Sequence, residues 1–154
     1  MSTKKITADE LGLHLSEPPS PTSSPSTTST DYFKWFLACL LFGNPIQQSI
    51  AKSAYNTLIE HDLTTPDAIV DAGWDKLVEI LDEAHYARYD YSTATKLLNV
   101  CGAIKEGYDG SFERLLEEAG GDRGVIEERL KGFKGVGPKT VEIFLRDAGP
   151  PLGI

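Results

Sequence analysis

The sequence is poor in cysteine and has no long apolar run. Its 154 residues include two cysteines, Cys39 and Cys101, and two thiols alone can neither complete a tetrahedral zinc site nor hold an iron–sulfur cluster. Both lie in apolar, helix-like surroundings, so we interpret them as core residues and expect no metal and no disulfide. No apolar stretch approaches the ~18 residues that cross a bilayer, and Met1 is not followed by a secretory signal. These absences predict an intracellular protein (cytoplasm, nucleoid or nucleus) that is not secreted and has no membrane partner.

Excess positive charge is also absent. With 23 acidic and 15 basic side chains the formal net charge is −8, which excludes broad, sequence-independent coating of nucleic acid. Residues 131–147 nevertheless carry a net charge of +2, so a local basic point lies on an acidic body. A hydrophobic fraction of 40% is enough to bury a core, which excludes a fully disordered chain.

The composition divides the chain near residue 30. Every residue of 18–30 is Pro, Ser or Thr, a composition with no apolar surface to offset the entropy of ordering the backbone. We therefore predict a disordered tail over 1–30 and a folded domain over 31–154. The alternative for the apolar island at 11–15 is that it docks on a surface that the sequence does not identify.

Apolar residues after position 30 recur with helical spacing, and no run alternates like a strand, so we predict an all-α bundle. Asp31 is the expected cap of a first helix that Gly43 ends. Thr65 and Pro66 suit the cap and first position of a helix that Gly73 breaks, and Gly107 is expected to end a later one. The other predicted helices cover residues 46–61, 66–72, 74–81, 92–106, 112–118 and 124–130, with a last one from about 138.

The segment with the most chemical information is Gly135-Val136-Gly137, which is followed by Pro138. A glycine turn between two helices exposes unpaired backbone N–H groups, and glycine leaves no side chain to block a phosphate. Val136 is expected to fill the inside of the turn. Lys134 before the turn, and Thr140 after it, are candidate DNA contacts together with the turn itself.

Residues 133–140, Phe-Lys-Gly-Val-Gly-Pro-Lys-Thr, resemble the helix–hairpin–helix signature of the endonuclease III-like DNA glycosylases. The resemblance extends to residues 32–44, which are similar to that superfamily's first core helix, and to residues 91–98, which are similar to its Ser-x-Ala helix. It covers about 31–147 in the family's order, and the chain looks like a C-terminally incomplete member.

The resemblance implies base-excision repair: an N-glycosylase and abasic-site lyase that acts on damaged or mismatched bases in double-stranded DNA. Lys139 occupies the position of the lysine that attacks the sugar C1′, and burial would lower its pKa for that task. Asn44 falls where the family fills the gap left by a flipped base. The family also suggests a monovalent cation at the hairpin. We expect no iron–sulfur cluster, and a monomer.

The catalytic aspartate of the family would fall at about position 157, after Ile154, where it would stabilise charge on the sugar. Asp147 is not accepted as a substitute, because eight residues of helix rise about 12 Å. The alternative is therefore a non-catalytic DNA-binding module in which Lys139 only contacts phosphate. A protein-interaction scaffold is a third possibility.

An aromatic-basic cluster precedes the Ser-x-Ala helix. It either stacks on a base or forms an ordinary packed loop. Its members are His85, Tyr86, Arg88, Tyr89 and Tyr91.

Overall fold

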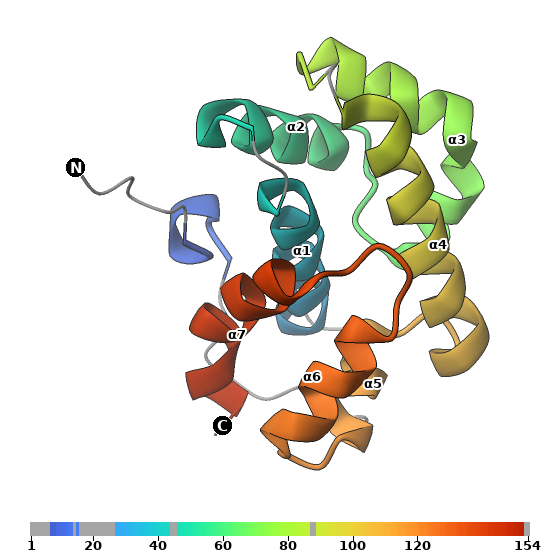
Figure 1. Ribbon diagram of the computed structural model, residues 1–154. Helices are drawn as coiled ribbons and strands as arrows, with labels where there is room; N and C mark the ends of the chain where they lie inside the picture. Colours follow the sequence, from blue (N-terminus) through green and yellow to red (C-terminus); the bar gives the residue numbers. More distant parts are fainter. Residues whose placement is uncertain (1–6, 14, 16–26, 44–45, 87–88, 153–154) are drawn as a thin grey trace.

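The computed structural model describes residues 7–13, 15, 27–43, 46–86 and 89–152, and the regular secondary structure in these ranges is helix, with no strand (Figure 1). The predicted all-α class is therefore confirmed. The elements are η1 (Asp9–Leu11), α1 (Thr27–Phe42), α2 (Gln48–Glu60), α3 (Pro66–Glu83), α4 (Asp90–Tyr108), α5 (Phe112–Glu118), α6 (Arg123–Lys131) and α7 (Pro138–Leu152).

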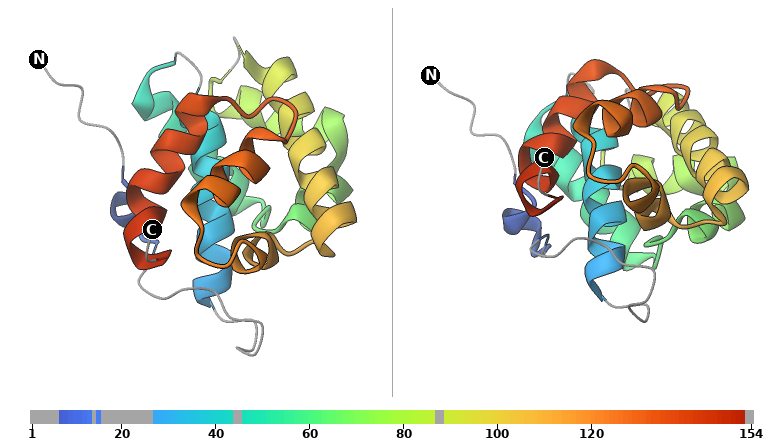
Figure 2. Two further views of the ribbon diagram at one scale, coloured as in Figure 1. Left: turned by 60° about the horizontal axis from the view of Figure 1, so that its bottom comes forward. Right: turned by 90° about the horizontal axis from the view of Figure 1, so that it is seen from below.

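Helix α1 lies at the centre, and α2, α4, α5 and α7 pack around it (Figures 1 and 2). Every residue from 35 to 41 is fully buried, which explains why this helix is apolar on all sides rather than amphipathic. Burial of such side chains contributes about 1.5–3 kcal/mol each. Helix α1 is therefore the element on which the rest of the fold is assembled.

An aromatic cluster joins α1 to α5 and α7. The Phe36 and Phe112 rings stack with centroids 4.7 Å apart, and Phe144 meets each of them edge-on at 5.6 Å. The Trp35 indole N–H donates to the Phe144 carbonyl at 3.2 Å. Helix α7 is thus fixed to the central helix both by ring packing and by a buried hydrogen bond.

Helices α3 and α4 lie side by side and pack extensively (Figure 1). Thr65 caps α3 as predicted, because its side chain accepts a hydrogen bond from the Ala68 N–H at 3.1 Å. The predicted break is also confirmed: Gly73 has φ 82° and ψ 166° inside α3, a conformation that glycine adopts without strain.

Two helix ends differ from prediction. Helix α1 begins at Thr27, so Asp31 is buried within it and is not its cap. A first turn of Ser and Thr can extend this helix because packing of the buried part already offsets the unfavourable nucleation step, and each added residue then only propagates the helix. Helix α4 continues past Gly107 to Tyr108 and ends where Asp109 adopts φ 54°.

The predicted tail over 1–30 is wrong for residues 7–13, 15 and 27–30, which the structure describes as ordered. Ala8, Leu13 and Leu15 are buried in the core, so the apolar island docks, which was the alternative reading. The Tyr32 hydroxyl donates to the Leu15 carbonyl at 3.3 Å. The composition argument failed here because it counted apolar surface within the segment alone, whereas these three side chains bury theirs against the helical domain.

Among the described residues, no helix is long and apolar enough to cross a membrane, and no group of three His, Cys, Asp or Glu side chains is placed to hold a metal ion. Cys39 and Cys101 are buried and free, as predicted. Burial raises the pKa of both thiols, so neither is a reactive thiolate at neutral pH.

Candidate nucleic-acid interface

The glycine turn, defined here as residues 132–137, connects α6 to α7. Phe133 and Val136 are buried, and the Val136 N–H donates to the Phe133 carbonyl at 3.1 Å. Gly135 has φ 97°, which is the left-handed region that favours glycine. The two buried side chains anchor the turn from inside, as predicted for Val136, while Gly135 stays exposed.

Backbone donors are free where α7 begins. No hydrogen bond between described groups uses the N–H of Gly137, Lys139 or Thr140, and the first one in this region runs from the Val141 N–H to the Gly137 carbonyl at 3.3 Å. Such N–H groups carry partial positive charge and suit an anionic oxygen. The start of α7 therefore offers several unpaired donors, of which that of Lys139 belongs to an exposed residue and that of Thr140 to a buried one.

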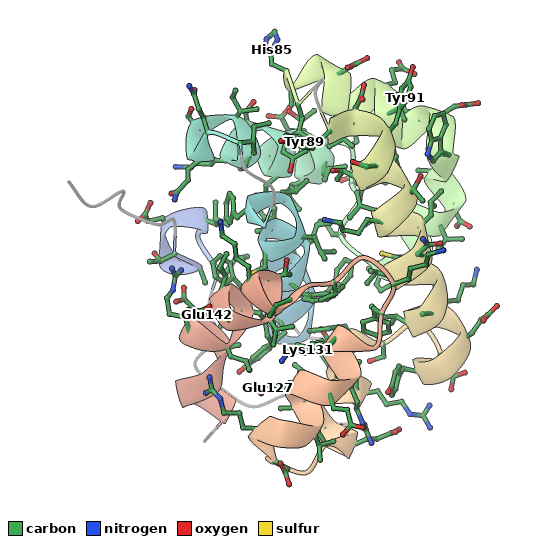
Figure 3. The ribbon with its side chains drawn as sticks, in the orientation of Figure 1. His85, Tyr89, Tyr91, Glu127, Lys131 and Glu142 are labelled. Carbon is green, nitrogen blue, oxygen red and sulfur yellow. The ribbon has the colours of Figure 1, made fainter. Side chains whose placement is uncertain are left out.

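Lysines without ion-pair partners surround these donors. Lys131, Lys134 and Lys139 are exposed, and in the described part of the chain none lies within salt-bridge distance of a carboxylate. Figure 3 shows Lys131 at the end of α6, where the chain enters the glycine turn. An acidic protein that leaves these cations unneutralised keeps a local positive potential at this point.

The start of α7 also contacts the end of α1. A side chain built on Gly43 would collide with the Thr140 hydroxyl and lie 3.3 Å from the Cys39 carbonyl, so the glycine is required for this close approach. Thr140 is itself buried. The end of α1 and the first turn of α7, about a hundred residues apart in the sequence, therefore lie together, which the sequence order alone does not show.

Helix α4 reaches the glycine turn through Lys96. A Cβ atom built on Gly135 would lie 2.9 Å from the Lys96 Cγ atom, so the lysine stem rests against the turn backbone. Lys96 is half-buried, and burial lowers its pKa. No sequence signal marked this residue, because it occupies one position of an amphipathic helix and acquires meaning only through the tertiary contact.

The two carboxylates of α7, Glu142 and Asp147, lie in different surroundings. Glu142 lies one helical turn after Lys139 and is exposed, and it lines a pocket of about 200 Å³ with Arg123, Ile143 and Arg146. Asp147 accepts a hydrogen bond from the Ala8 N–H at 2.7 Å. It also pairs with Arg146, whose Nε lies 2.8 Å away.

Asp147 is therefore a structural residue that holds the N-terminal segment against α7. This agrees with the expectation that it does not assist Lys139. Arg146 also lies over the Trp35 ring, 5.9 Å from its centroid, so Arg146 connects α7 to α1 while Asp147 connects it to the N-terminal segment.

Other predicted site residues have different outcomes. The burial expected to activate Lys139 is wrong, since Lys139 is exposed at the start of α7 and the helix turns this position outward. Asn44 lies outside the described residues. Gly135, Val136, Gly137, Lys134 and Thr140 are all brought together at one place, as their closeness in sequence predicts.

The aromatic-basic cluster does not form one pocket. Tyr86 is buried, and its hydroxyl donates to the Leu41 carbonyl at 2.6 Å. His85 and Tyr91 lie apart on the surface (Figure 3), with Tyr91 63% exposed beside Trp74. Arg88 lies outside the described residues. The packed-loop interpretation therefore holds for Tyr86, and His85, Tyr86 and Tyr91 do not share one base pocket.

The fold and this site define an all-helical protein in which an exposed glycine turn is surrounded by unpaired lysines. Comparison of the chain with known protein families, curated proteins and solved structures gives no match.

Proposed function

We propose that this chain is a base-excision DNA repair protein that binds double-stranded DNA through a helix–hairpin–helix made by α6, the glycine turn and α7. The observation that carries this proposal is the convergence of free N–H groups with unpaired lysines at the start of α7. Free amides suit the non-bridging oxygens of a phosphate. Lysines that bind phosphates displace the counterions condensed on DNA, which makes the binding depend on salt. The proposed partner is therefore the DNA backbone, contacted at one point and in a salt-dependent manner.

The proposed reaction is cleavage at abasic sites by Lys139. In the ring-opened abasic sugar C1′ is an aldehyde carbon. The unprotonated Lys139 amine adds to it, and the adduct loses water to give an imine. The imine acidifies the C2′ proton. Loss of that proton to water or a nearby base breaks the C3′–O bond and releases the 3′ phosphate, and hydrolysis of the imine restores the lysine.

Removal of a damaged or mismatched base is the step that would precede this lyase reaction. It requires a negative group beside the developing charge on the sugar. Asp147 already binds the Ala8 N–H and Arg146, so we do not assign it this role. The lyase step needs only a positioned amine, and it is the part of the reaction that the described residues support best.

Borohydride trapping on a duplex with one abasic site tests the proposal, because borohydride reduces the imine to a stable covalent complex. We expect trapping by the unaltered chain and its loss in both Lys139→Ala and Lys139→Gln. Lys134→Gln is the matched control, since Lys134 is equally an exposed lysine of the same region. This control should weaken binding but retain trapping at saturating protein.

The second candidate is a non-catalytic DNA-binding module. The exposure of Lys139 favours it, because an exposed lysine lacks the desolvated surroundings that activate an amine as a nucleophile. Salt-sensitive binding without any trapping would establish this second function and exclude the lyase. Absence of binding at low salt would contradict both.

A further inference from the structure

Lys96 is the residue of α4 that faces the glycine turn. Its neighbours Ala94 and Leu97 are fully buried, so the rotation of the helix about its axis is fixed, and with it the direction in which the Lys96 side chain leaves the helix. The Gly135 backbone packs on this stem, since an added Cβ would lie 2.9 Å from Cγ and 3.5 Å from Cβ of the lysine. Lys96 is therefore a fixed part of the support beneath the turn.

A lysine is an expensive residue for a purely structural role at this position. Its ammonium group loses hydration as the stem is covered, and the structure shows no compensating ion pair for Lys96 within its described ranges. The positions one turn before and after it on α4 are uncharged, as are the turn residues that flank Lys134. A methionine would fill the same space without that cost.

We propose that Lys96 is a phosphate-binding residue of the DNA site, which acts from α4 across the glycine turn. A phosphate bound at Gly135 would be contacted by the turn from one side and by the Lys96 ammonium from the other. The anion supplies the partner that the protein does not. This inference rests on the proposed DNA binding and extends the site from two helices to three.

The test is DNA binding by Lys96→Met over a range of salt concentrations. Fluorescence anisotropy of a duplex that carries a stable abasic analogue measures the binding. Loss of one phosphate contact should lower the magnitude of the log K against log salt slope by about 0.9 and weaken binding about tenfold. Lys105→Gln is the matched control, because Lys105 lies on the same helix but pairs with Asp67 at 3.9 Å. It should leave the slope unchanged.

Thermal unfolding of the same variants separates binding from structure. A phosphate-binding role predicts that Lys96→Met melts at the same or a higher temperature than the unaltered chain while it binds DNA more weakly. Lys96→Arg should keep the salt slope. If the unaltered chain binds and Lys96→Met keeps both slope and affinity, the role of Lys96 is refuted and the proposed function stands. If the unaltered chain does not bind, the proposed function itself fails.

Chemical protection needs no substitution and covers the case in which Lys96→Met does not fold. The unaltered chain is acetylated with and without saturating duplex, and each lysine is quantified by mass spectrometry. We expect DNA to reduce acetylation of Lys96 at least severalfold and to leave Lys105 unchanged. Equal acetylation of Lys96 in the two samples, with DNA bound, would overturn the inference.

Discussion

The glycine turn and the neighbouring α5–α6 region handle positive charge in opposite ways. On α5, Arg114 pairs with Asp109 at 2.6 Å and with Glu118 at 2.8 Å, and on α6 Arg123 pairs with Glu127 at 3.2 Å. At the glycine turn, Lys134 and Lys139 have no such partner among the described carboxylates. In an acidic chain, the cations left unpaired mark where a negative ligand would bind most favourably.

Arginine and lysine suit these two settings. A guanidinium holds two carboxylates in fixed geometry, as Arg114 does, whereas an ammonium on a flexible stem can follow a phosphate that arrives from solution. The ion pairs of α5 and α6 are exposed, so water and salt screen them and they contribute little to stability. The comparison therefore predicts that removal of positive charge at the glycine turn weakens DNA binding, whereas the same removal on α5 and α6 leaves it almost unchanged.

The largest expected effect comes from removing together the lysine of the glycine turn and the lysine at the start of α7. The double variant Lys134→Gln/Lys139→Gln should bind duplex DNA about a hundredfold more weakly at moderate salt, because two charged phosphate contacts are lost. Arg114→Gln/Arg123→Gln makes the same change in net charge and should keep its affinity within about twofold. Anisotropy titrations of both variants measure the difference, and equal losses would show that only net charge matters.

The next largest effect is expected at Glu113 of α5, because its carboxyl group is buried without a basic partner among the described side chains. Burial raises its pKa to about 7, while hydrogen bonds from Ser111 and the Phe33 backbone act in the opposite direction. Its Oε2 atom is buried without a hydrogen-bond partner in the described part of the structure. The folded state thus retains a proton that the unfolded chain releases at lower pH.

The sign of the pH effect follows from linkage. Stability from the protonated carboxyl is fully present below the ordinary glutamate pKa of about 4.3 and is lost as pH rises to 7. The stability that Glu113→Gln gains over the unaltered chain should therefore be about 2–3 kcal/mol larger at pH 8 than at pH 5. Calorimetry at both pH values tests this, with the exposed Glu117→Gln as the control that should show no such difference.

A smaller effect tests whether α1 and the start of α7 meet as described. Gly43→Ala should cost about 1–3 kcal/mol by overpacking against Thr140. Thr140→Ala makes room, so the double variant should lose at least 0.5 kcal/mol less than the sum of the single losses, as roughly expected for contacting residues. Urea unfolding of the four proteins gives the coupling.

The control for this cycle is Gly107→Ala. Gly107 lies within α4, and an added Cβ meets no atom within 4 Å, so alanine should stabilise the helix by up to about 1 kcal/mol. Additive losses at positions 43 and 140 would instead show that the two segments do not touch.

Local structure was readable from the sequence wherever the determining contacts are close in the chain. The Thr65 cap, the break at Gly73 and the helix over 112–118 each depend on hydrogen bonds or backbone preferences within a few residues, and each is confirmed. The buried Val136 and the exposed Gly135 follow from the same local pattern. The list of candidate residues at the turn was therefore available from the sequence.

Tertiary structure alone decided what surrounds that turn. The contacts of Gly43 with Thr140 and of Lys96 with Gly135 join segments far apart in sequence, and no local pattern encodes such pairs. The same holds for Ala8, whose N–H binds Asp147 and draws a segment predicted as tail onto α7. The sequence determined which helices form and where the chemical groups lie along them. Packing around α1 decided which groups meet, because burial of apolar surface is non-directional and only the completed core selects one arrangement.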